Sequence, residues 1–112
     1  MTKVAFLFLI AAVPAIVAAK VVGRTVDYKS GDIHLKGYLA YDAGVKAKRP
    51  GVIVVHEWWG LVDYPRKRAD MLAKLGYVAF AADMYGDGKT ADNPTDAQKL
   101  AGESMKDPEA LK

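Results

Sequence analysis

Hydrophobic and polar residues alternate over two neighbouring stretches near the start of the chain. The stretches are residues 24–28 and 33–41, and Ser30, Gly31 and Asp32 between them are common turn residues. Alternation places apolar side chains on one face of a strand and polar side chains on the other. The pattern therefore predicts an antiparallel hairpin with one solvated face.

The next segments lack this alternation. Residues 51–55 read Gly, Val, Ile, Val, Val, a run that suits a strand covered on both faces. A helical pattern follows over about residues 63–75, where Asp63 is expected to cap the start and Gly76 to end the helix. Residues 77–82 form a second short apolar run. Strand, helix and strand in about thirty residues predict a βαβ unit.

The remaining segment predicts a loop and a second helix. Residues 83–94 are rich in Gly, Asp and Asn, with Asp83 expected to cap the loop backbone, and Thr95 is expected to begin a weaker helix that runs to about Lys106. Two helices are few for about four strands, because buried parallel strands need helices on both faces and neighbours at the edges. We therefore expect residues 20–112 to be the incomplete N-terminal part of an α/β domain.

An apolar segment precedes the hairpin. Lys3 is followed by an almost unbroken apolar run of 16 residues from Val4 to Ala19, and small residues stand before the charged Lys20. This layout is typical of a secretory signal peptide, and the run is short for a membrane span of ~20 residues. We expect residues 1–19 to be an export signal, and the protein to be periplasmic or secreted. An uncleaved anchor and a buried N-terminal helix are the alternatives.

Composition narrows the possible partners. Hydrophobic residues make up 52% of the 112 residues and charged residues 26%, a balance that can fill a packed core. The net charge of +3 comes from scattered Lys and Arg, and the densest cluster, residues 66–68, is too short for a nucleic-acid-binding stripe. We expect no nucleic-acid partner and no membrane contact apart from the export signal. The chain has no cysteine, which excludes disulfides and thiolate metal sites.

Chemistry is expected where the buried strand ends, because ligands of open α/β sheets bind beyond the carboxyl ends of the strands. His56, Glu57, Trp58, Trp59 and Gly60 follow directly after that strand. A carboxylate at such a position is expected to be partly desolvated. For either tryptophan alone, packing under the rim of the sheet is the simpler interpretation.

Two known motifs are matched only in part. His56 and Glu57 begin the zinc-protease pattern H-E-x-x-H, but the fifth position is Gly60 and the segment ends a strand where that motif needs a helix. His34 is the only other histidine, so we expect no metal site. Residues 102–106 approach the nucleophile motif G-x-S-x-G but lack its last glycine, so we expect no serine nucleophile there.

Several blocks, in the right order, resemble the dienelactone hydrolase family. They are residues 56–60 after the apolar strand, residues 75–77 at the end of the helix and residues 83–86 after the next strand, and the similarity covers about residues 51–103. The resemblance implies an α/β-hydrolase fold, of which this chain holds the N-terminal hairpin and the first βαβ unit of a mostly parallel sheet with helices on both faces. It also implies a Cys, His, Asp triad that lies entirely C-terminal to this region, and no cofactor.

By position, the resemblance implies two catalytic residues and three pocket residues. Glu57 matches a glutamate that contacts the nucleophilic thiol and tunes its ionisation, and the Trp58 backbone NH matches an oxyanion-hole donor. His56, Trp59 and Tyr85 are expected to contact the substrate. The implied function is hydrolysis of a small ester or lactone by a nucleophile, expected to be Cys, outside this chain. A non-catalytic small-molecule-binding protein on the same fold and a natural truncated product are the alternatives, and the oligomeric state is not predicted.

Overall fold

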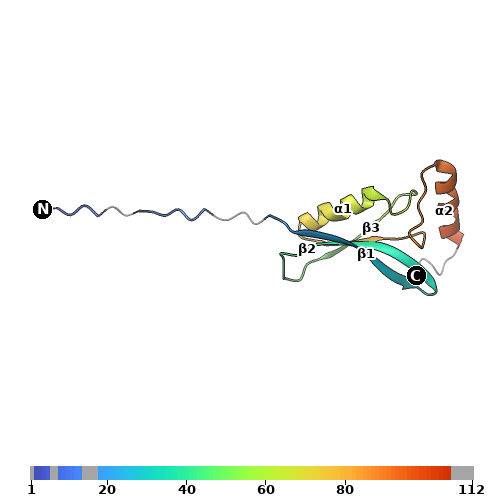
Figure 1. Cartoon of the computed structure of the whole chain (residues 1–112), viewed down its shortest axis with the longest axis horizontal. Coiled ribbons are helices and arrows are strands. Elements are labelled where there is room, and N and C mark those ends of the chain that lie inside the picture. Colours follow the sequence, from blue (N-terminus) through green and yellow to red (C-terminus); the bar gives the residue numbers. More distant parts are fainter. Residues whose placement is uncertain (1, 6–7, 14–17, 107–112) are drawn as a thin grey trace.

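The computed structural model describes residues 2–5, 8–13 and 18–106 (Figure 1). Within them, four strands form one sheet, accompanied by two helices. The strands are β1 Val21–Ser30, β2 Ile33–Asp42, β3 Gly51–Val55 and β4 Val78–Ala82, and the helices are α1 Asp63–Lys74 and α2 Pro94–Lys106. The order across the sheet is β1-β2-β4-β3, which confirms the α/β class expected from the sequence.

The strand pairings make the described sheet mixed. β1 and β2 are antiparallel along their whole length, from Val21 opposite Asp42 to Ser30 opposite Ile33, as the alternating pattern predicts. β4 is antiparallel to β2 and parallel to β3, and α1 connects the two parallel strands as the predicted βαβ unit. Among the described residues, parallel pairing is therefore confined to β3 and β4, because the N-terminal hairpin joins the sheet in the antiparallel sense.

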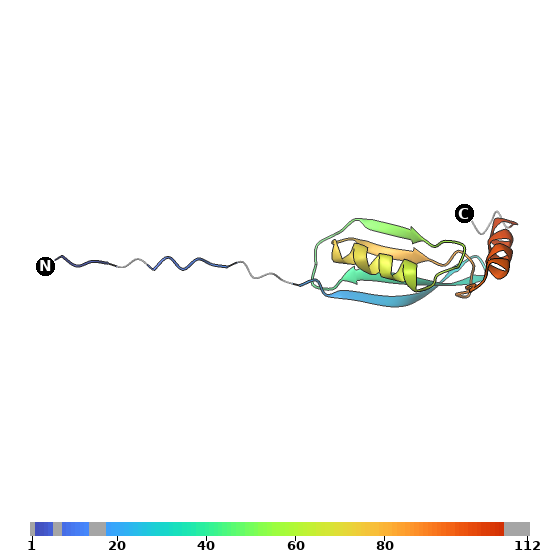
Figure 2. The same cartoon turned by 90° about the horizontal axis from the view of Figure 1, so that it is seen from above.

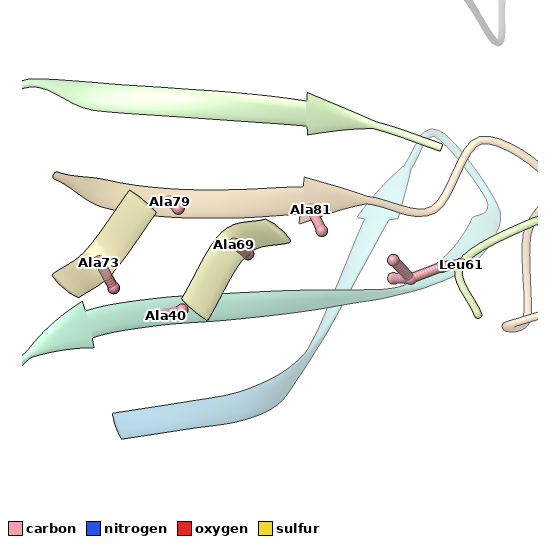
Figure 3. Close-up of a cluster of buried hydrophobic side chains, with 6 residues drawn as sticks. All are labelled: Ala40, Leu61, Ala69, Ala73, Ala79 and Ala81. Carbon is pink, nitrogen blue, oxygen red and sulfur yellow. The ribbon is translucent and has the colours of Figure 1, made fainter. Parts of the chain in front are cut away.

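α1 lies over one face of the sheet (Figure 2), and mostly small side chains pack between the two. The buried cluster between them consists of Ala40, Leu61, Ala69, Ala73, Ala79 and Ala81 (Figure 3). Alanine loses no rotamer entropy on burial and keeps the helix close to the strands. α2 lies beyond the end of the sheet (Figures 1 and 2), and Ala97 is its buried residue. In the described part of the chain, α2 thus does not cover the second face of the sheet.

The helix starts differ from the predicted caps. Asp63 is the first residue of α1, and Val62 at the cap position makes no side-chain hydrogen bond, so the predicted Asp63 cap is wrong. α2 is capped by Asn93, whose Oδ1 accepts a hydrogen bond of 3.0 Å from the Asp96 amide, two residues before the predicted Thr95. Because Pro is favoured at the first helical position, the helix begins directly after Asn93.

The end of α1 agrees with the prediction. Gly76 has a φ of +98°, a left-handed conformation that glycine adopts without steric cost. The amides of Gly76 and Tyr77 donate hydrogen bonds to the carbonyls of Ala73 and Leu72, at 3.0 and 3.2 Å. This pair of bonds is a Schellman motif, which satisfies carbonyls that the end of a helix otherwise leaves without partners.

β3 forms an edge of the sheet in the described residues. Its neighbour on one side is β4, and the side chains of Ile53 and Val55 are 71% and 63% exposed. The sequence predicted a strand of the buried type here, left partly uncovered by the available helices. The exposure of these β-branched side chains agrees with that prediction.

The expected export signal lies partly within the described residues. Residues 2–5 and 8–13 form no helix or strand, and Phe8 is 90% exposed. No helix in the described ranges is long and apolar enough to cross a membrane. The export signal and its cleavage after Ala19 stay predictions.

A buried carboxylate organises the loop after β4. Asp83 is 3% exposed, and its two oxygens accept hydrogen bonds from four backbone amides. Oδ2 accepts from Lys36 at 3.0 Å and Gly88 at 2.9 Å, and Oδ1 accepts from Tyr85 at 3.1 Å and Gly86 at 3.0 Å. One side chain therefore caps the loop, as expected from the sequence, and also ties it to β2.

Replacing Asp83 by Asn is expected to lower the free energy of unfolding by about 3 kcal/mol, because the amide NH₂ faces buried donors that lose their acceptor. Urea titrations measure this quantity. Asp87→Asn is the matched control: it removes the same charge from an exposed side chain of the same loop, at a φ of +49° that Asn tolerates. We expect the control to change stability by less than about 0.5 kcal/mol. Equal effects of the two substitutions would contradict the anchoring role of Asp83.

Candidate active site

A cavity of about 430 Å³ lies where β3 ends and α1 begins. It is lined by Val54, Val55, His56, Glu57, Trp59, Gly60, Val62, Tyr64, Pro65 and Arg68. Of the site residues expected from the sequence, His56, Glu57 and Trp59 therefore meet at one cavity. Trp58 and Tyr85 are not among its lining residues.

Glu57 is exposed at the rim of this cavity. This exposure differs from the partly desolvated carboxylate expected from the sequence. The physical reason is the position of the residue: it follows β3, and β3 is an edge strand in the described part of the chain. The Glu57 side chain is thus available to a group that approaches the carboxyl end of β3.

Three residues of α1 line the cavity, and two of them, Tyr64 and Arg68, form a pair that was not expected from the sequence. The Arg68 guanidinium donates hydrogen bonds of 2.8 and 2.6 Å to the Tyr64 hydroxyl, and its carbon lies 5.0 Å from the centre of the Tyr64 ring. Residues four apart on a helix share a face, so their spacing is the signal that would have paired them. The cavity therefore has one carboxylate and one guanidinium among its lining residues.

The two tryptophans have different environments. Their rings pack edge to face, with centres 5.2 Å apart and an interplanar angle of 62°. Trp58 is 43% exposed, whereas Trp59 is half-buried and lines the cavity. Trp59 therefore supplies an apolar part of the cavity wall, whereas the more exposed Trp58 is not among the lining residues.

Hydrogen bonds hold the loop of residues 57–60 in place. The Gly60 amide donates to the Glu57 carbonyl at 3.1 Å, which closes a tight turn. Gly60 forms an isolated bridge with Thr90, and the Ala91 amide donates to the Trp59 carbonyl at 2.9 Å. The loop after β3 is therefore fixed against the loop after β4.

The Trp58 backbone NH has no acceptor in the described ranges, as is also the case for the NH groups of Glu57 and Trp59. A backbone NH is an obligatory donor and is satisfied by water or a ligand when the protein offers no acceptor. The family resemblance marks the Trp58 NH as an oxyanion donor, and in residues 18–106 it has no competing protein acceptor.

Tyr85 restrains the loop of residues 57–60 through two contacts. Its hydroxyl donates a hydrogen bond of 2.8 Å to the Trp58 carbonyl, and its ring packs against His56 at a centroid distance of 4.8 Å. Burial raises the pKa of Tyr85 above its ordinary value of 10.0, so the hydroxyl keeps its proton and remains a donor. Tyr85 therefore restrains the loop, and the substrate contact expected from the sequence stays a prediction.

The described ranges contain no set of side chains arranged to bind a metal ion. Within them, no group of three or more His, Asp or Glu side chains is placed to hold a metal ion. The arrangement can instead present an NH donor and a carboxylate to a reacting group at the end of β3.

Comparison with known proteins identifies the family. The sequence profile described as "Dienelactone hydrolase family" matches residues 35–111, which is more than half of the chain. The chain belongs to the dienelactone hydrolase family. It is 44% identical over 81 residues to "Protein usf" of Aquifex pyrophilus, an alignment that covers 70% of this chain and 33% of that protein.

Two further similar proteins support this assignment to the family. The chain is 42% identical over 84 residues to a protein of Aquifex aeolicus named "Putative carboxymethylenebutenolidase", covering 72% of this chain and 35% of that protein. The solved structure of a dienelactone hydrolase-like promiscuous phosphotriesterase from metagenomic libraries matches with a TM-score of 0.74 and 35% identity, covering 81% of this chain and 38% of the other. The likeness confirms the α/β-hydrolase fold. The chain spans about a third of the length of these two curated relatives.

Gly60→Ala should destabilise the protein more than Gly76→Ala. Both glycines have left-handed φ values, +89° and +98°, so both substitutions incur a backbone cost of about 1 kcal/mol. A Cβ on Gly60 would also lie 2.6 Å from the Lys89 carbonyl oxygen, whereas a Cβ on Gly76 meets no atom within 4 Å. We expect a total loss of about 3 kcal/mol for Gly60→Ala, measured by urea unfolding. Similar losses of stability for the two variants would contradict a close contact between Gly60 and the loop after β4.

Proposed function

We propose that this chain is the N-terminal part of a hydrolase that acts on small esters or lactones. In this proposal the nucleophile, expected to be a cysteine, lies on a part of the protein C-terminal to Lys112. The observation that carries the proposal is the Trp58 NH, which has no acceptor in residues 18–106 and directly follows Glu57 in the sequence at the carboxyl end of β3.

The chemistry of acyl transfer explains why these two groups matter. Attack of a nucleophile on an ester carbonyl converts the carbonyl oxygen into an oxyanion, and a pre-positioned NH donor stabilises the charge that develops there. The Trp58 NH is the donor that this chain supplies. Glu57 would lie against the thiol of the nucleophile and influence how readily the thiol ionises.

The relatives support a hydrolase over a non-catalytic binding protein. One is named as a carboxymethylenebutenolidase and another as a promiscuous phosphotriesterase, and both names describe hydrolytic enzymes. The cavity beside Trp59 is of a size that suits a small substrate. The described residues offer no feature that favours the binding-protein alternative.

The proposed function predicts where activity resides and how Glu57 contributes. A protein extended beyond Lys112 by its C-terminal region should hydrolyse a simple aryl ester, whereas residues 20–112 alone should not, because they lack a nucleophile. In the extended protein, Glu57→Gln should lower kcat/KM by about 10-fold to 1000-fold and shift its pH dependence, since the amide keeps the shape but removes the charge.

Glu103→Gln, an exposed glutamate of α2, is the control and should leave the pH profile unchanged. Thermal melts of all variants separate activity from folding. Turnover by residues 20–112 alone, or an extended protein without esterase activity, would overturn the proposed function. A Glu57→Gln enzyme with an unchanged pH profile would remove Glu57 from the site.

We also propose that residues 1–19 direct export and are removed after Ala19. The support is the basic start, the apolar run and the small residues before Lys20. After expression in a bacterium with a periplasm, mass spectrometry of the exported protein should find Lys20 at the N-terminus. Leu9→Arg, which interrupts the apolar run, should keep the uncleaved chain in the cytoplasm. An exported protein that begins at Met1 or Thr2 would exclude cleavage.

A further inference from the structure

His56 uses both ring nitrogens within the protein. The side chain is only 9% exposed, and its Nε2 accepts a hydrogen bond of 3.0 Å from the Met84 amide. A backbone amide can only donate, so Nε2 carries no proton and the proton of the neutral ring lies on Nδ1. Nδ1 is 2.6 Å from the Glu57 carbonyl oxygen and donates to it. The ring therefore joins the residue after β3 to the loop after β4.

The bond from His56 to Glu57 acts on the peptide group that carries the oxyanion donor. The Glu57 carbonyl and the Trp58 NH belong to one planar trans peptide unit, in which the two groups point in opposite directions. A constraint on the carbonyl therefore sets the direction of the NH. The Glu57 carbonyl has two donors, His56 Nδ1 and the Gly60 amide at 3.1 Å.

The other end of the His56 ring is attached to a fixed support. Met84 lies between Asp83, whose carboxylate accepts four backbone hydrogen bonds, and Tyr85, whose hydroxyl holds the Trp58 carbonyl at 2.8 Å. The peptide groups on both sides of Trp58 are thus each held by a side chain. His56 provides the restraint on the side that carries the NH.

We propose that His56 is a positioning residue that orients the Trp58 NH toward the developing oxyanion, and that it acts neither as a general base nor as a simple pocket wall. This inference rests on the proposed function, because it assigns a task within that reaction. A donor that is oriented in advance stabilises the transition state more than the bound substrate. Loss of the restraint should therefore lower kcat and leave KM nearly unchanged.

The test uses the extended, active protein and two isosteric variants. In His56→Asn the side-chain amide NH₂ takes the place of Nδ1 and can still donate to the Glu57 carbonyl. In His56→Gln the amide oxygen takes the place of Nε2 and keeps the acceptor for Met84, but the donor to Glu57 is lost. We expect kcat to fall about 10-fold to 100-fold in the Gln variant and less than about 3-fold in the Asn variant, below the ~10² to 10³ known for complete loss of an oxyanion donor.

The readouts separate this role from a purely structural one. KM should change less than about 3-fold in both variants, and thermal melts should show a loss of stability for each, since each breaks one hydrogen bond. His34→Gln, on an exposed histidine of the hairpin, is the control and should leave kcat unchanged.

Three outcomes would overturn the proposal: equal kcat values for the Asn and Gln variants, an unchanged kcat in both, or a loss confined to KM. An extended protein with no esterase activity of its own would instead contradict the proposed function. If the Gln variant alone fails to fold, the Asn variant still tests the proposal. Its kcat must then stay near that of wild type.

Discussion

The buried carboxylate of Asp83 is the interaction on which the carboxyl end of the sheet depends. Its four hydrogen bonds gather amides from β2 and from the loop after β4, and charge-assisted bonds of this kind are stronger than those between neutral groups. The loop that it fixes presents the Met84 amide to His56 and the Tyr85 hydroxyl to the Trp58 carbonyl. The conformation of residues 57–60 thus depends on a side chain more than twenty residues away in the sequence.

The small hydrophobic core explains why hydrogen bonds contribute strongly to holding the loops at the carboxyl end of the sheet. α1 meets the sheet through alanines, and in the described ranges no large side chain is fully buried. Stabilisation by apolar burial scales with the area removed from water, which alanine supplies sparingly. Close packing of α1 brings Tyr64 and Arg68 beside the end of β3, where they complete the cavity wall. The loops at this end are then held by directed polar contacts.

Local sequence patterns predicted the individual helices and strands better than the contacts between segments that are distant in the sequence. The uninterrupted apolar run of residues 51–55 and the helix that ends at Gly76 were recognisable because each signal lies within a few residues. The cap of α2 was misplaced because Asn93 and Thr95 are both good caps, and Pro94 decides between them. The hydrogen bond of Tyr85 reaches a residue 27 positions earlier, a relation that no local pattern reports. The position of α2 beyond the sheet likewise depends on packing that periodicity does not report.

The proposed mechanism places two separable requirements on the protein. The nucleophile requires a reactive side chain and its base, whereas the oxyanion donor requires only a peptide group held in one orientation. The second requirement concerns the described residues: His56 and Gly60 restrain the carbonyl before Trp58, and Tyr85 restrains the carbonyl after it. Because these restraints are made entirely within residues 18–106, the direction of the donor is established before substrate arrives, which is the condition for electrostatic preorganisation.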